Sequence, residues 1–186
     1  YVTEHNKDMK VIYTPTSTFS NELISAIRSN SKSATSEFRE LYRTADVLIV
    51  DDIQYLVGKT STQEEFFQTF NELYERGKQI VLAADKPPKE IATLEERIRS
   101  RMEWGMIADI GVPDVETRIA ILYKKAQIER YNISREAIEY IADISTTNIR
   151  EMEGYLSRVV FFAGLIGENP ASIQSAREAL KNIAIE

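Results

Sequence analysis

The apolar residues of this chain fall into two kinds of pattern. Short, largely apolar runs lie at 10–14, 47–51, 79–84 and 106–110. Runs of this kind are typical of strands buried in a parallel sheet. Between them, apolar residues recur about every three or four positions, which predicts helices near 18–28, 36–43 and 94–102. Strands that alternate with helices predict an α/β fold, a parallel sheet flanked by helices.

Polar residues mark the ends of these elements. Thr62 and Glu65 have the spacing of a capping box, and they predict a helix that starts there and ends before Gly77. The polar segment 29–36 is predicted to be a surface loop. Ile24 lies at a spacing that fits the core face of the helix at 18–28.

The pattern changes after Pro113, where only helical periodicity remains. Helices are predicted near 114–129, 134–143, 148–163 and 172–183, with Ser134 and the pair Asn148 and Glu151 as caps of the second and third. We therefore predict two domains, an α/β core at 1–112 and a small helical lid at 113–186.

Composition excludes several kinds of site. The chain of 186 residues has no cysteine and one histidine, His5, so cysteine-based metal sites are excluded and a histidine metal site or a Ser-His-Asp triad is not expected. No apolar run is long enough to span a bilayer, and no signal segment opens the chain. These features predict a cytoplasmic protein. The net charge of −6 argues against broad, non-specific binding to nucleic acid, although Arg and Lys cluster at 97–101 and 118–130.

Two adjacent acids, Asp51 and Asp52, follow the most apolar of the predicted strands. Ligands of α/β folds bind at the carboxyl ends of the strands, and in P-loop NTPases an acid there holds Mg²⁺. A polar turn after a strand is the simpler interpretation. Two acids in tandem favour a Walker B site.

The chain contains a partial match to a phosphate-binding loop. Gly58-Lys59-Thr60-Ser61 resembles the end of a P-loop, but the glycine that should precede it is replaced by Ile53. We interpret Gly58-Lys59 as a basic surface turn, and the other glycines do not form a phosphate loop either. Either a phosphate-binding segment lies before residue 1, or the protein does not bind ATP.

Several longer motifs resemble one family. The segments that carry the resemblance are Asp46–Gln54, Gln63–Asn71, Gly77–Leu82, Pro87–Ile91 and Asn148–Gly154. Together they resemble the AAA+ domain of the DnaA family of bacterial replication initiators, over nearly the whole chain. The resemblance implies a module switched by ATP and ADP that assembles head to tail with copies of itself on origin DNA and opens the duplex. It also implies contact with the replicative helicase machinery.

The resemblance implies roles for three acids. Asp51 would hold Mg²⁺ through its bound waters, Asp52 would help to position the attacking water, and Asp85 would sense the γ-phosphate. These roles suit carboxylates, because Mg²⁺ prefers hard oxygen ligands and keeps several waters. The alternative for each acid is a turn or cap residue.

The resemblance also implies roles for three arginines. Arg97 would be an arginine finger that reaches a neighbouring subunit's nucleotide, Arg101 a second interface arginine, and Arg150 a nucleotide sensor in the lid. Guanidinium groups suit these roles, because they stay charged and fork onto phosphate oxygens. The alternative for Arg97 and Arg101 is a solvated, salt-bridged face beside Glu95, Glu96 and Glu103, and Arg150 has acids nearby too.

In the family, single-stranded DNA contacts the sheet domain at positions that match Ile24 and Lys59. Three features depart from the family pattern. The family's P-loop strand and its helix, expected before residue 1, and its helix-turn-helix domain, expected after residue 186, are not within this sequence, and segment 29–36 is a few residues longer than usual. The P-loop strand would lie between the strands at 79–84 and 106–110. Two alternatives remain open, a helicase loader or DnaA-like regulator, and a fragment that binds a partner but no nucleotide.

Overall fold

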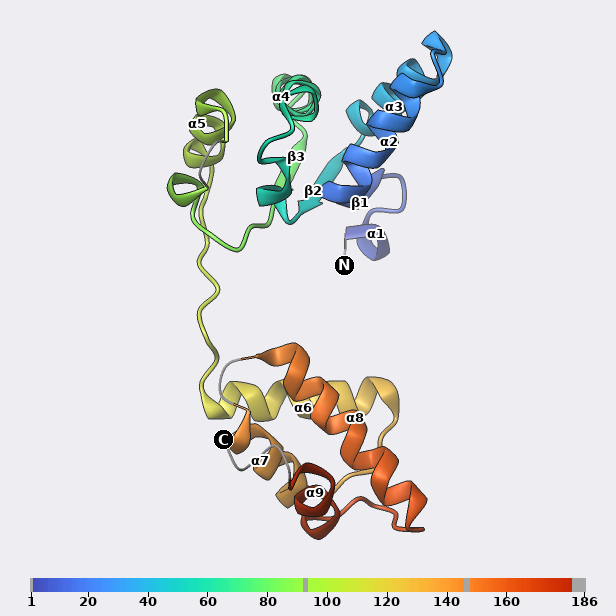
Figure 1. Ribbon diagram of the computed structural model, residues 1–186, viewed down its shortest axis with the longest axis vertical. Coiled ribbons are helices and arrows are strands. Elements are labelled where there is room, and N and C mark those ends of the chain that lie inside the picture. The colour runs from blue at the N-terminus through green and yellow to red at the C-terminus, as the bar shows by residue number, and fades with distance from the viewer. Residues whose placement is uncertain (1, 92–93, 146–147, 182–186) are drawn as a thin grey trace. The chain divides into compact units, whose positions relative to one another are not determined.

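The computed structural model describes residues 2–91, 94–145 and 148–181 of the chain. It divides into two compact units, Tyr1–Ala108 and Asp109–Glu186 (Figure 1). The division falls close to the expected domain boundary at 112/113, which itself stays a prediction. Within the described ranges, no helix has the length and apolarity that a membrane crossing requires.

Three parallel strands form the sheet of the first unit. They are β1 (Val11–Pro15), β2 (Val47–Asp51) and β3 (Gln79–Leu82), in the order β1-β2-β3. Val47 of the central strand pairs with Val11 on one side and with Gln79 on the other. Because the three strands run in one direction and in register, their carboxyl ends meet at one edge of the sheet.

Five helices accompany the sheet in the described part of this unit. They are α1 (Val2–His5), α2 (Thr16–Arg28), α3 (Lys32–Arg43), α4 (Thr60–Glu75) and α5 (Glu96–Trp104), with short 3₁₀ turns η1 (Ile53–Leu56) and η2 (Pro88–Glu90). Figure 1 shows α2 and α3 side by side. The core centres on Phe19, which is fully buried and meets the rings of Phe38, Tyr42 and Phe66 at 5.1, 4.8 and 6.0 Å.

The sheet has a covered face and an open face. Side chains alternate along each strand, so every second residue points to the same side. Leu48 and Val50 point into the core, whereas Tyr13 and Val81 belong to the opposite set and are exposed. The expectation of a sheet with helices is confirmed, but among the described residues helices cover only one of its faces.

Two predicted helix starts and one predicted strand are wrong. Helix α3 already begins at Lys32, because Ser31 caps it by accepting a hydrogen bond from the backbone N–H of Ala34, so segment 29–36 is mostly helical rather than a loop. Helix α4 begins at Thr60, so Thr62 and Glu65 lie inside it and form no capping box. Segment 106–110 forms no strand. Met106 and Ile110 are 94% and 95% exposed, and an extended segment becomes a strand only when a neighbour pairs with it.

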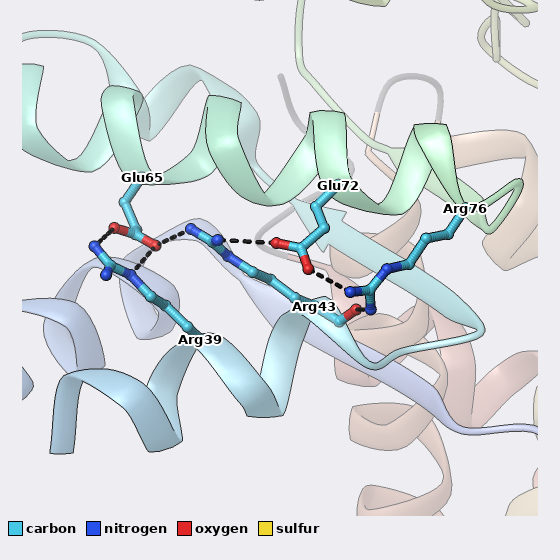
Figure 2. A network of polar contacts seen from close by, with 5 residues as sticks. All are labelled: Arg39, Arg43, Glu65, Glu72 and Arg76. Atoms are coloured by element: carbon cyan, nitrogen blue, oxygen red, sulfur yellow. Dashed lines mark hydrogen bonds and ion pairs between the residues drawn. The ribbon is translucent and has the colours of Figure 1, made fainter. Parts of the chain in front are cut away.

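Glu65 instead joins α4 to α3 through a network of ion pairs (Figure 2). Its carboxylate accepts two hydrogen bonds from Arg39, at 2.9 and 2.8 Å, and one from Arg43 at 2.7 Å. Arg43 also donates to Glu72, which accepts from Arg76. Burial alone would raise the pKa of Glu65, but the guanidinium groups outweigh it and hold that pKa below its ordinary value.

We expect Glu65→Gln to lower the free energy of unfolding of this unit by about 2 kcal/mol. The Glu65 side chain is only 9% exposed, and the substitution removes the negative charge that pairs with Arg39 and Arg43. The control is Glu75→Gln on the exposed side of the same helix. Urea unfolding at neutral pH measures the difference. Equal stability of the two variants would show that the network contributes nothing.

The depressed pKa of Glu65 also sets a pH dependence. A carboxyl group whose pKa is lowered by folding stabilises the fold above its unfolded pKa, near 4.3, and loses that contribution as the pH falls through the folded value. The stability of the native chain should therefore fall more steeply below about pH 4 than that of Glu65→Gln.

The second unit is a bundle of helices α6 (Val115–Glu129), α7 (Arg135–Ile144), α8 (Ile149–Leu165) and α9 (Ile173–Leu180). Ser134 caps α7, and Asn148 caps α8 by accepting from the backbone N–H groups of Arg150 and Glu151, as predicted. Leu122, Ile141, Met152 and Leu156 are fully buried between these helices. Arg118, from the basic cluster at 118–130, donates to the carbonyls of Pro113 and Ala142 and so has a structural role.

Candidate nucleotide and metal site

The two acids lie at the carboxyl end of the central strand. Asp51 is the last residue of β2, and both of its carboxylate oxygens accept a hydrogen bond. The Tyr13 hydroxyl donates to Oδ2 at 2.9 Å, and the backbone N–H of Asp52 donates to Oδ1 at 2.9 Å. Thr16 at the start of α2 donates to the Asp51 carbonyl at 2.8 Å. Hydrogen bonds from β1 and from the start of α2 therefore fix the end of this strand.

Asp52 turns the chain out of the sheet. Its backbone is left-handed, with φ 56° and ψ 49°, a conformation that Asp tolerates better than most residues. Gln54 donates from Nε2 to Asp52 Oδ1 at 3.0 Å. Asp52 is exposed after this turn, whereas Asp51 is half-buried. Backbone strain held at the end of a central strand is typical of functional sites.

Asp85 follows β3, and Lys59 follows the turn η1 that comes after β2. Ala83, just beyond β3, donates to the Val50 carbonyl at 2.9 Å and accepts from the Ile53 N–H at 3.0 Å, so the chain leaving β3 stays beside the acid pair. Asp85 comes two residues later and is exposed. Lys59 directly precedes α4, after Gly58 in a left-handed turn with φ 74°, and is also exposed.

The oxygen ligands at this edge suit Mg²⁺ better than a metal ion whose ligands all come from the protein. Asp51 and Asp52 offer hard carboxylate oxygens, and no group of three or more His, Cys, Asp or Glu side chains gathers as a metal site in the described part of the chain. Mg²⁺ is commonly held by one or two carboxylates together with waters and substrate phosphates. The acid pair has the donor type and number for that arrangement.

Arg97 lies on α5 and is held by partners within this unit. Its guanidinium pairs with Glu64 of α4 and with Glu95, and it stacks over the Phe67 ring with its Cζ 4.5 Å from the ring centroid. The hydrogen bond with Glu64 raises the pKa of Arg97 above its ordinary value, and the hydrogen bond with Glu95 adds a smaller effect in the same direction. In this structure Arg97 is therefore a salt-bridged residue of α5, which was the alternative to an arginine finger.

Arg101, one turn further along α5, has aromatic partners instead. Its Cζ lies 5.3 Å from the Tyr74 ring centroid and 5.6 Å from that of Trp104. Trp104 is 71% exposed and its ring lies 5.7 Å from that of Tyr74. An arginine held over aromatic faces keeps its N–H donors available, because the ring attracts the cation without accepting every donor.

The remaining predicted residues, Ile24 and Arg150, belong to other elements than the acid pair. Ile24 is on α2 and is 39% exposed, so it does not belong fully to the core as its spacing suggested. Leu23 and Ala26 form the face of α2 that packs into the core, and Ile24 lies beside that face rather than on it. Arg150 lies in the first turn of α8, in the second unit, and is exposed.

Two residues of the site were missed from the sequence, Tyr13 and Gln54. Each donates to one of the two acids. Tyr13 reaches Asp51 only because β1 and β2 run parallel with Tyr13 opposite Ile49, and this register cannot be read from one sequence. Gln54 follows Asp52 by two residues, so its contact with Asp52 could have been predicted from the sequence.

The combination of a parallel sheet, acids at the end of its central strand and a separate helical unit defines an AAA+ type of fold. The Thermotoga maritima RuvB Holliday junction branch migration motor resembles the chain in fold alone, with 17% identity and a TM-score of 0.64 over 95% of this chain and 54% of that one. A family model described as the bacterial DnaA ATPase domain matches residues 1–109. The chain belongs to the bacterial DnaA ATPase domain family, and it is an AAA+ module of a replication initiator.

Two solved structures support this assignment. Domain III of the Thermotoga maritima replication initiation protein DnaA is 32% identical, with a TM-score of 0.91, over 100% of this chain and 76% of that chain. A replication initiator DnaA bound to AMPPCP and single-stranded DNA is 34% identical, with a TM-score of 0.73, over 88% of this chain and 50% of that chain. The present sequence therefore spans about three quarters of the first relative and half of the second.

Proposed function

We propose that this chain is the ATP-switched module of a replication initiator that assembles head to tail on origin DNA and promotes duplex opening. The observation that carries the proposal is the acid pair Asp51 and Asp52 at the end of the central strand, in a family with a relative that binds the ATP analogue AMPPCP. Mg²⁺ bound with ATP supplies charge neutralisation at the phosphates. Asp51 would hold this ion through its waters, and Asp52 would orient the attacking water.

The nucleotide also needs a phosphate-binding segment, and the sheet has a place for one. Strand β3 has no partner on its outer side among the described residues. A free strand edge is a template for another strand. We infer that a phosphate-binding strand from outside residues 1–186 pairs here, and that segment 106–110 then pairs with that strand in turn.

Asp85 and the three arginines complete the proposed switch. Asp85 would sense the γ-phosphate from the end of β3. Arg97 and Arg101 on α5 would face the nucleotide of a neighbouring copy, and Arg150 would contact the nucleotide from the helical unit. Arg97 must leave Glu64 and Glu95 to act in this way, whereas Arg101 gives up contacts with aromatic rings. The proposed partners are further copies of the chain, single-stranded and origin DNA, and the replicative helicase machinery.

Ile24 and Lys59 are the proposed contacts for single-stranded DNA, which one relative binds. Lys59 is an exposed cation at the start of α4, and a lysine there suits a phosphate contact. The exposed flank of Ile24 offers an apolar surface to a base or sugar.

Binding of a fluorescent oligothymidine by the full-length protein tests the proposal. We expect ATP to strengthen binding, and Lys59→Ala to weaken it and to reduce the slope of log affinity against log salt by about one. Lys7→Ala, an exposed lysine with no proposed contact, is the control. Binding that ignores ATP would instead favour an interaction module without a nucleotide switch, and an unchanged salt slope would remove Lys59 from the DNA contact.

A further inference from the structure

The open face of the sheet carries a tyrosine whose hydroxyl has a specific task. Tyr13 is 61% exposed. In parallel strands, paired residues point to the same face, and Tyr13 pairs with Ile49, two residues before Asp51. Tyr13 and Asp51 are therefore diagonal neighbours on the open face, a separation that an aromatic side chain can bridge. The hydroxyl donates to Asp51 Oδ2 at 2.9 Å.

With this hydrogen bond, both oxygens of the Asp51 carboxylate accept from the protein. Oδ1 of Asp51 is held by the Asp52 N–H, and Oδ2 is held by Tyr13. With one donor on each oxygen, rotation of the carboxylate plane breaks at least one hydrogen bond. Each oxygen keeps a further lone pair, so the carboxylate can still accept from the waters of a bound cation.

We propose that Tyr13 is a positioning residue that fixes the Asp51 carboxylate for Mg²⁺. This inference rests on the proposed role of Asp51. Hydrogen-bond partners of a metal-binding side chain set its orientation, and their removal commonly weakens the metal site by about 10–100-fold. Because Tyr13 is largely exposed, its effect lies at the lower end of that range.

The test is the affinity of the full-length, ADP-bound protein for Mn²⁺ in place of Mg²⁺, followed by electron paramagnetic resonance of the free ion. We expect Tyr13→Phe, which removes only the hydroxyl, to raise the half-saturating Mn²⁺ concentration about tenfold. Tyr55→Phe is the matched control, since Tyr55 is an exposed tyrosine in η1 for which no contact with Asp51 exists in the described structure. Thermal unfolding without metal should be the same for all three proteins.

Asp51→Asn separates this inference from the proposed function. If Asp51→Asn weakens Mn²⁺ binding but Tyr13→Phe matches the native protein, the positioning role is wrong and the metal role of Asp51 stands. If Asp51→Asn also binds Mn²⁺ normally, both are wrong. A loss in Tyr13→Phe that Tyr55→Phe shares would overturn the inference too, because it would not be specific to the bond with Asp51.

Discussion

Replacing Asp51 and Asp52 together with asparagine is expected to abolish Mg²⁺-dependent ATP hydrolysis by the full-length protein, with turnover reduced about a hundredfold or more. Asparagine keeps the size of each side chain but removes the two charges that attract the cation. It also tolerates the left-handed backbone of residue 52, so the turn out of β2 persists. Steady-state release of phosphate at saturating ATP, measured across a range of Mg²⁺ concentrations, gives the effect.

Asp8→Asn provides the control for loss of one exposed acid elsewhere in the same unit. It should hydrolyse ATP as the native protein does. Normal turnover by the double variant would mean that the acid pair only ends a strand, which is the simpler interpretation of the sequence.

Arg97→Ala is expected to leave ATP affinity unchanged and to abolish ATP-dependent assembly, because an arginine finger acts on the nucleotide of the neighbouring copy. Fingers supplied in trans are worth about 10³–10⁵ in the rate of phosphoryl transfer, so turnover in the assembled state should fall steeply as well. Light scattering on addition of ATP measures assembly, and a fluorescent nucleotide measures affinity.

Arg99→Ala on the same helix is the matched control, since Arg99 has no proposed interface role. The internal pairs of Arg97 with Glu64 and Glu95 are partly exposed and worth little to the fold, so the variant should fold normally. If Arg97→Ala assembles as Arg99→Ala does, Arg97 is a salt-bridged surface residue, and Arg101, which stacks on aromatic rings, becomes the better proposal.

The sequence predicted the elements that depend on local pattern. The apolar run before Asp51 forms β2 within the predicted bounds, and Ser134 and Asn148 cap their helices because a side-chain oxygen at that position serves the first N–H groups of the helix. The position of the acid pair at a strand end followed from the same run.

Features that depend on tertiary partners were not predictable in this way. Glu65 has capping-box spacing after Thr62, but two arginines of α3 draw its carboxylate across to a neighbouring helix. Segment 106–110 has the apolar content of a strand but no paired neighbour among the described residues. The Tyr13 contact depends on the register of β1 against β2, which only the folded sheet defines.

A crystal structure of the full-length protein with AMPPCP and Mg²⁺ tests the assignment of the acid pair most directly. We expect electron density for the ion at the carboxyl end of β2, with its bound waters donating to the Asp51 carboxylate. An ion bound to the nucleotide but out of reach of both Asp51 and Asp52 would contradict their assignment as the metal-holding pair.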